Sequence, residues 1–400
     1  MGERSGRFVR QPAGYTAFIP APLPPDPPLQ MDGELWSLLS AADRALGRLD
    51  GSTEVLPNPD LFLAMYVRQE AVLSSQIEGT QASLVDILEY EADAARKGLP
   101  ADVAEVVNYV SAMNYGLGRL AAMPLSLRLL REIHAELLQG VRGAQRSPGE
   151  FRTTQNWIGS ANAPLERAIF LPPPPAEMLK ALGDLELFLH DPTPLPTLVK
   201  AGLVHGQFET IHPFLDGNGR VGRLLISFLL VQQGVLRQPL LYLSYYLKQH
   251  RDEYYDLLQA VRTKGNWESW LRFFLRGVSE VAEAATDTAR QILRLREEHR
   301  EIVSREGRAA GNALRLLEHL YQQPILSARR AAELLQVTYP TANGLMVRLA
   351  DLGLLDETTG ATRNRVFVYS PYLRLFEPHA EQNRPKGPPA GTLPESEGRA

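Results

Sequence analysis

Hydrophobic residues recur at helical spacing along most of the chain. Leu39, Ala42, Leu46 and Leu49 follow the repeat of one helix face and predict a helix from about residue 33. The same repeat predicts further helices at 101–118, 126–139, 176–190, 196–211 and 220–233. Two more helices are expected within 240–278, with bulk from Tyr254, Tyr255, Trp267 and Trp270. The expected fold class is therefore mainly α.

The pattern changes towards the C-terminus. A long charged amphipathic helix is expected over 281–305 as a connector. After it, Ser327 is expected to cap a short helix, and 340–350 to form a second helix after a turn. Val366 and Val368 alternate with polar neighbours, which predicts a strand. Helix, turn, helix and hairpin is the order of a winged-helix domain, expected over 306–375.

The two ends of the chain are poor in helical pattern. Residues 1–30 are rich in proline and are expected to be an extended arm, either packed or loose. Residues 376–400 combine several Pro, Gly and Glu and are expected to be disordered.

The composition excludes several kinds of chemistry and binding. The chain has 400 residues, a net charge of −4 and no cysteine. Two or three domains are therefore expected, without disulfides or thiolate chemistry and without a global basic field for nucleic acid. No signal peptide or long apolar run is evident, which favours a cytoplasmic protein that does not bind a membrane.

The most informative segment is the loop 212–223, HPFLDGNGRVGR. Gly217 and Gly219 allow backbone N–H groups to converge, and a helix starting near Arg220 adds its positive dipole end. Arg220 and Arg223 are spaced to lie on one side of that helix. The loop is therefore expected to cradle a polyphosphate, with Asp216 at its edge for Mg²⁺ and His212 as a possible general base.

The loop is also compatible in part with two other interpretations. The string Gly217-x-Gly219-x-x-Gly222 also fits a dinucleotide fingerprint, but a helical pattern precedes it and no Asp or Glu follows before Asp252. An ordinary helix–helix turn would explain the glycines, but not the His, Asp, Asn and two Arg that accompany them.

With those residues in view, the loop resembles the signature of the Fic family at every defined position. The resemblance implies that His212 is the general base, that Asp216 ligates Mg²⁺, and that the nucleotide is bound by Gly217, Asn218, Gly219, Arg220, Val221, Gly222 and Arg223. Arg223 would meet the terminal phosphate, and Tyr254 is a further candidate at the adenine. The residues from Pro148 to Gly159 resemble the segment before the family's target-binding flap, and Ile169, Phe170 and Leu171 the flap itself.

A second stretch, Ser74 to Gly79, resembles the inhibitory motif of the same family. Asn58-Pro59-Asp60 is expected to start a helix and Gly79 to stop it, so Ser74 and Glu78 share one helix face. A glutamate near a helix C-terminus is unfavourable to the dipole, which suggests that Glu78 has another partner. The resemblance implies that this partner is Arg223.

These resemblances imply a Fic-type helical core over 116–280, preceded by an arm and inhibitory helix over 1–115. The implied activity is that of a nucleotidyltransferase that moves AMP from ATP to a Ser, Thr or Tyr hydroxyl of a protein, itself included, under restraint by Glu78. Removal of AMP from a modified target is a further possibility, and a homodimer stays open.

Two alternatives remain. A Fic fold could use another nucleotide donor, because the anion cradle does not contact the base. The chain could also be a DNA-binding regulator, although residues 306–377 carry eight Lys and Arg against seven Asp and Glu, and the candidate recognition helix only Arg348.

Overall fold

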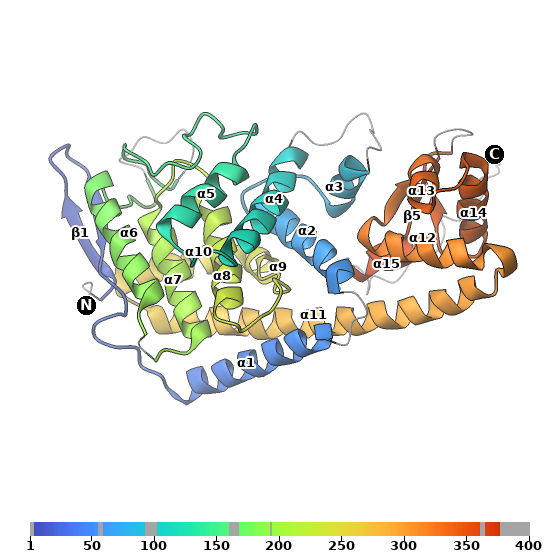
Figure 1. Cartoon of the computed structure of the whole chain (residues 1–400). Coiled ribbons are helices and arrows are strands. Elements are labelled where there is room, and N and C mark those ends of the chain that lie inside the picture. The colour runs from blue at the N-terminus through green and yellow to red at the C-terminus, as the bar shows by residue number, and fades with distance from the viewer. Residues whose placement is uncertain are drawn as a thin grey trace, which may run out of the picture.

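The computed structural model describes residues 4–54, 59–92, 102–159, 168–192, 194–360 and 365–376. Its elements are mainly helices, and one of them, α11 (Trp267–Ser304), runs along the base of the molecule (Figure 1). None of the described helices combines the length and apolar content that a membrane span requires.

The N-terminal arm is packed and forms a hairpin. Strands β1 (Gly6–Arg10) and β2 (Thr16–Pro20) pair antiparallel, with Phe8 opposite Phe18. Arg4 fastens the arm to the start of α11, because its Nη1 and Nη2 donate to the Glu268 carboxylate at 2.9 and 2.8 Å. Of the two possibilities left open for this arm, the structure shows the packed one.

Four helices follow the arm. Helix α1 (Gly33–Glu54) lies along α11, and α2 (Pro59–Ile77) packs against α4 (Val103–Leu120). Helix α2 starts and ends where the sequence predicts. Helix α3 (Leu84–Glu91) was not predicted, although a capping box marks its start, since the Ser83 hydroxyl accepts from the Asp86 N–H and the Asp86 carboxylate from the Ser83 N–H.

The centre of the molecule is built around α7. Helices α5 (Leu127–Leu137), α6 (Pro175–His190), α7 (Thr197–Ile211) and α8 (Asn218–Gln232) lie within two residues of their predicted bounds. Every residue of α7 from Leu198 to Ile211 is buried. Helices α9 (Ser244–Gln249) and α10 (Arg251–Lys264) complete the core. The loop at the C-terminal end of α7 is thus held from several sides.

One prediction about this region was wrong. A break was expected between the helices of 240–278 and the connector of 281–305, but α11 is continuous from Trp267 to Ser304. Gly277 does not stop the helix, because it is a packing contact: a Cβ there would lie 2.5 Å from the Tyr246 ring. The connector therefore begins inside the core and leaves it as a rigid rod.

The C-terminal module stands at the far end of α11 (Figure 1). It contains α12 (Ala310–Gln322), β3 (Ile325–Ser327), α13 (Ala328–Leu335), α14 (Tyr339–Asp351), β4 (Asp356–Glu357), β5 (Val366–Val368) and α15 (Ser370–Leu373), with 3-10 turns at Gly307–Ala309 and Arg374–Phe376. Its three strands form one antiparallel sheet in the order β3-β5-β4. Ser327 caps α13 as predicted.

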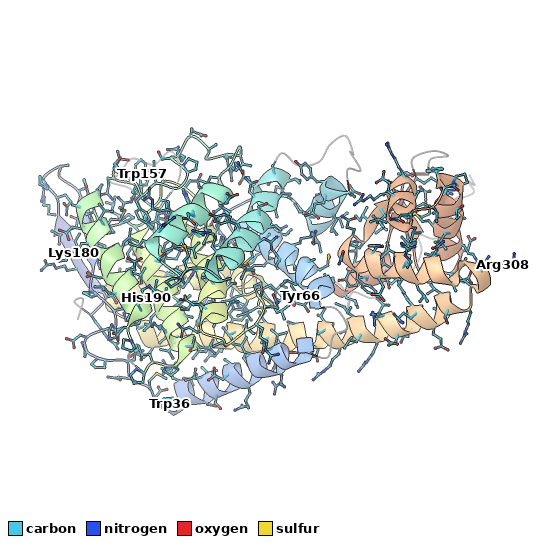
Figure 2. All side chains as sticks on the ribbon, viewed as in Figure 1. Trp36, Tyr66, Trp157, Lys180, His190 and Arg308 are labelled. Atoms are coloured by element: carbon cyan, nitrogen blue, oxygen red, sulfur yellow. The ribbon has the colours of Figure 1, made fainter. Side chains whose placement is uncertain are left out.

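The module's elements follow the order expected from the sequence, while its assignment as a winged-helix domain stays a prediction. The tail expected to be disordered lies, apart from Phe376, outside the described residues. Figure 2 shows the side chains that fill the structure, with Tyr66 near the middle of the molecule and Arg308 at the outer end of the module.

Candidate active site

The loop between α7 and α8 begins with His212 in a strained backbone conformation. His212 is the C-cap of α7, with φ 50° and ψ 61°, in the left-handed region that residues other than glycine seldom adopt. Its N–H donates to the Phe208 carbonyl oxygen at 2.9 Å, which closes the last turn of the helix. Such strain in a non-glycine residue is common where a side chain has to be aimed at a ligand.

Asn218 locks this loop in shape. Its side-chain NH₂ donates to the carbonyl oxygen of Phe214, and its Oδ1 accepts from the Phe214 N–H, both at 2.8 Å. Phe214 itself is fully buried in the core. These contacts hold the start of α8 and the His212 end of the loop in a fixed relation.

Gly217 and Gly219 of the loop have different structural roles. Gly217 has a φ of 75° and stands immediately before the first residue of α8. Gly219 instead allows a close approach, because a Cβ there would lie 2.3 Å from Glu78 Oε1 and 2.9 Å from Arg223 Nη1. The first turn of α8, where backbone N–H groups lack partners within the helix, is therefore the place where the Glu78 carboxylate lies.

Arg223 is fixed by the end of α2. Its Nε donates to the Ser74 hydroxyl at 2.7 Å, and its Nη2 donates to the Ser74 carbonyl oxygen at 2.9 Å and to Glu78 Oε1 at 2.8 Å. Arg223 is 3% exposed and Ser74 is fully buried. Gly79, at φ 99°, ends this segment just after the carboxylate. Ser74, Glu78 and Gly79 are thus brought together with the loop.

Arg220 is the second cation of the cradle. It lies 3.3 Å from Glu78 Oε2, 3.4 Å from Glu105 Oε2 and 3.5 Å from Asp216 Oδ1. Burial alone would raise the pKa of Glu78, but the charges of Arg223 and Arg220 outweigh it and hold that pKa below its ordinary value. An ionised carboxylate therefore occupies an anion site made of two guanidinium groups and a helix N-terminus.

The His212 imidazole lies among cations. Burial, followed by the charges of Arg262 and Arg152, lowers its pKa to about 3. Its Nδ1 is buried and has no hydrogen-bond partner among the described residues. The ring is therefore neutral near pH 7, which is the form that can accept a proton.

Arg152 ties the preceding segment to His212. Its guanidinium donates to the carbonyl oxygens of His212 at 2.9 Å and Thr154 at 3.2 Å, and also to that of Pro173. Asn156 helps from the same segment by donating to the Phe214 carbonyl oxygen at 2.9 Å. The segment whose sequence resembles the pre-flap region is thus the scaffold for both the loop and the flap.

His134 was not recognised in the sequence. It stacks on Phe214, with ring centroids 3.8 Å apart, and its Nδ1 accepts from the Gly149 N–H at 2.8 Å, so its Nε2 carries the proton and donates to the Asp216 carbonyl oxygen at 3.0 Å. Burial lowers its pKa to about 4, which keeps this neutral form. The available signal was its position on the apolar stripe of a strongly amphipathic helix, where a histidine needs partners.

Asp216 has room to meet a cation. Its side chain is 36% exposed, and its Oδ1 accepts from the Gly217 N–H at 2.6 Å. Among the described residues no group of three or more His, Asp or Glu could hold a metal ion. These residues fit a divalent cation that is shared between one carboxylate and phosphate oxygens, which is how Mg²⁺ usually binds with nucleotides.

The described part of the flap is a short bridge. Ile158 and Phe170 pair antiparallel, and the Leu171 carbonyl oxygen accepts from the Phe18 N–H of β2 at 2.9 Å. Ile169 is 70% exposed, whereas Phe170 is buried with Arg262 4.0 Å from its ring centroid. Ile169 is thus the flap residue that faces solvent, and residues 160–167 lie outside the described ranges.

Three nucleotide-site candidates are buried, two of them on α8 and one on α10. Val221 is fully buried, and a Cβ on Gly222 would lie 2.5 Å from the Glu209 carboxylate. Tyr254 is 1% exposed, and its hydroxyl is 2.9 Å from His205 Nε2. The structure places all three in the core behind the cradle, and their contact with a nucleotide stays a prediction.

Comparison with known proteins finds one family. Residues 36–118 match the Fic/DOC family N-terminal model, and residues 124–230 match the Fic/DOC family model. Over 165 residues the chain is 33% identical to the protein adenylyltransferase Fic of Culex quinquefasciatus, across 41% of this chain and 29% of that relative. Over 181 residues it is 31% identical to a probable protein adenylyltransferase of Aquifex aeolicus, across 44% of this chain and 51% of the relative.

The chain thus spans about half or less of the length of these relatives. Among solved structures, it resembles a Fic family protein from Desulfovibrio desulfuricans, with a TM-score of 0.54 and 19% identity, across 86% of this chain and 97% of the other. That likeness supports the mainly helical Fic fold. Residues 36–118 and 124–230 are thus similar to the two parts of the Fic/DOC family, and the second match contains the whole loop from His212 to Arg223.

Proposed function

We propose that this protein is a protein adenylyltransferase that moves AMP from ATP to a side-chain hydroxyl of a target protein and is restrained by Glu78. The observation that carries the proposal is the anion site on the first turn of α8, next to a neutral His212. Its cations, Arg220 and Arg223, are held on a rigid helix and already bind a carboxylate. The relatives named as protein adenylyltransferases support the same activity.

The chemistry needs a base on one side and positive charge on the other. The target hydroxyl oxygen attacks the α-phosphorus of ATP, the bond to the β-phosphate oxygen breaks, and pyrophosphate leaves. His212 takes the hydroxyl proton. Arg220, Arg223 and the N–H groups of α8 stabilise the charge that builds up on the leaving diphosphate. Mg²⁺, held by Asp216, would supply further positive charge to the phosphates.

The electrostatics around His212 suit a base that works only with nucleotide present. Burial, followed by the charges of Arg262 and Arg152, lowers its pKa and so disfavours the protonated form, and no carboxylate among the described residues hydrogen-bonds to the ring. The negative charge of bound ATP opposes these cations and would make the imidazole a stronger base. The base therefore gains strength when a substrate has arrived.

Glu78 restrains the reaction by occupying part of the cradle. Its Oε1 bonds to the Arg223 Nη2 that a terminal phosphate would need. Carboxylate–arginine pairs of this kind are strong and directional. ATP bound beside Glu78 would keep its phosphates out of line for attack, and misplacement by about 1 Å can cost ~100-fold in rate. The proposal extends to the reverse process, in which the same carboxylate positions water for removal of AMP from a modified target.

The target would be held by the flap. Ile169 offers an exposed edge next to the Ile158–Phe170 pair, so an extended target segment could add to it by main-chain pairing. Such pairing selects extended backbone and leaves the identity of the hydroxyl residue to the neighbouring pockets. Main-chain pairing therefore does not select among Ser, Thr and Tyr, and the proposal covers all three hydroxyl residues.

The test is self-labelling with radiolabelled nucleotides. Glu78→Gly is incubated with Mg²⁺ and ATP, GTP, CTP or UTP labelled at the α-phosphate, with Glu78→Gly/His212→Ala as the matched control. Labelling from ATP that the double variant lacks supports adenylyl transfer. Labelling from another nucleotide alone would change the donor, and no labelling from any nucleotide, either of the protein itself or of a cell extract, would contradict the proposal.

A further inference from the structure

Helix α2 touches two distant parts of the molecule. At its C-terminal end, Ser74 and the following Glu78 hold Arg223 of the active site. Earlier in the same helix, Gln69 and Tyr66 meet the last described residue of the C-terminal module, Phe376. Helix α2 accordingly lies between the core and the module (Figure 1).

The contact with the module is specific and buried. Gln69 Nε2 donates to the Phe376 carbonyl oxygen at 3.3 Å, and the rings of Tyr66 and Phe376 meet edge to face with centroids 5.7 Å apart. Tyr66, Gln69 and Phe376 are 1%, 8% and 8% exposed. Helix α12 also packs directly on α2. The module is thus docked on α2 as well as joined to the core through α11.

Aromatic rings continue this contact into the module. Phe376 packs edge to face on Tyr372, at 5.3 Å between centroids, and Tyr372 does the same with Tyr321 of α12, at 5.0 Å. Tyr321 and His299 of α11 both bond to the Tyr369 hydroxyl, at 3.1 and 2.7 Å. A shift of the module on α11 would therefore move Phe376 as well.

The position of Glu78 depends on α2. The Glu78 N–H donates to the Ser75 carbonyl oxygen at 3.0 Å, and the Gly79 N–H to that of Gln76 at 3.1 Å. The carboxylate thus follows the last helical turn. From Gln69 to Ser74 the helix rises only about 7.5 Å, at ~1.5 Å per residue, so a tilt or shift at Gln69 reaches the Arg223 contact.

We propose that the C-terminal module is a brace that holds α2 in the position where Glu78 occupies the cradle, and that loosening this brace releases the transferase. The inference rests on the proposed function for its consequence in activity, but not for the mechanical coupling. Binding of a partner to the module is the event that would loosen it. The coupling joins the module to the Glu78 end of α2, and the Phe376 ring contact and the Gln69 hydrogen bond can be altered separately.

The experiment uses the full chain with two brace variants. Phe376→Ala removes the ring, and Gln69→Met removes the hydrogen bond while keeping the side-chain length. Tyr339→Ala is the matched control, because Tyr339 is 40% exposed and starts α14, on the side of the module away from α2 (Figure 1). Each is also combined with Glu78→Gly.

Self-labelling should rise about 3- to 10-fold in Phe376→Ala and less in Gln69→Met, the range that such coupling residues usually give, and stay unchanged in Tyr339→Ala. In the Glu78→Gly background neither brace variant should add anything, since the restraint is already gone. Equal acceleration with and without Glu78, or none in either brace variant while Glu78→Gly is fast, would overturn the proposal.

Hydrogen exchange separates this proposal from the proposed function. Amides of residues 74–79 should exchange faster in Phe376→Ala than in the wild type, whereas the amides of α7 should not change. Unchanged exchange at 74–79 overturns the brace, whatever the activity shows. Faster exchange with no transfer by any variant supports the brace and contradicts the adenylyltransferase.

Discussion

The Fic core and the C-terminal module bury different kinds of side chain. The core holds buried charged residues around its loop: Glu70, Glu105, Glu209, Arg152, Arg220, Arg223 and Arg262. In the described part of the module, residues 306–360 and 365–376, no Asp, Glu, Lys, Arg or His is buried, and aliphatic and aromatic side chains fill the interior. Since burying charge is costly, it is concentrated where chemistry requires it.

Two buried carboxylates of the core have raised pKa values. Burial raises the pKa of both Glu70 and Glu209 to about 7. Glu209 Oε1 has no hydrogen-bond partner among the described residues, whereas Glu70 accepts from Ser244 and Tyr109. The comparison teaches that the core is built for handling charge and the module for packing and contact. Each prediction below tests that division.

The largest effect is expected from His212→Ala. In the Glu78→Gly background, transfer should fall by about 10²- to 10⁴-fold, the usual worth of a general base, because no other described side chain replaces the imidazole. ATP binding, measured by calorimetry, should persist, since Arg220 and Arg223 remain. His319→Ala, in the module, is the matched control and should leave transfer unchanged. Undiminished transfer by His212→Ala would show that this histidine of the core is not the general base.

Glu78→Gly is expected to have the next largest effect. Transfer should rise at least about 100-fold, since the phosphates regain Arg223 and align for attack. Arg223→Ala should not mimic it, because the phosphate loses its partner together with the inhibitor. Initial rates of self-labelling for the wild type, both single variants and the double variant check this. A Glu78→Gly rate no higher than that of the wild type would reduce the Glu78 contact to a structural ion pair.

Much of this site could be predicted from the sequence, because its residues are close together in the chain. The loop from His212 to Arg223 carries its helix start, its glycines and its cations in one stretch. Gly219 shows the limit: the sequence predicts that it lets backbone N–H groups converge, while the structure shows that its lack of a side chain leaves room for Glu78 Oε1. That reason lies in a contact with a residue far away in the chain.

The parts that could not be predicted depend on such distant contacts. His134 holds the loop from α5, and Phe376 meets Gln69 across 307 positions. Neither has a local motif. The continuity of α11 was also missed, and the small size of Gly277, through which the helix passes, is explained only by its contact with the distant Tyr246 ring.

A smaller effect is expected from pH. Burial, with Arg262 and Arg152, lowers the pKa of His212 to about 3, so the neutral imidazole is fully present at pH 6. The kcat/KM of Glu78→Gly, which reports groups of the free enzyme, should therefore change less than about 2-fold between pH 8 and 6. A histidine with a pKa of about 6.5 would lose ~4-fold over that range.

The Glu209→Gln variant removes a second group that could titrate between pH 6 and 8, so that the pH dependence of kcat/KM reports on His212. The Glu209 carboxyl itself has a pKa near 7 and could produce a pH dependence of its own. A fall of about 4-fold or more from pH 8 to 6 that persists in the Glu209→Gln variant would show that His212 titrates normally and that the neighbouring guanidinium groups do not control it.

The smallest effect is expected in DNA binding by the module. Helix α14 has Arg348 as its one basic residue, and that guanidinium is paired with Glu306. Non-specific DNA binding requires several phosphate contacts, so an electrophoretic shift of a duplex should be absent at ~50 mM salt and micromolar protein. Glu306→Gln sharpens the test, because it frees Arg348 without adding charge to α14. If the module only packs and makes protein contacts, this variant should also leave the duplex unshifted. A shift that Glu306→Gln strengthens and Arg348→Ala abolishes would give the module a nucleic-acid surface and break the division between a core that handles charge and a module that does not.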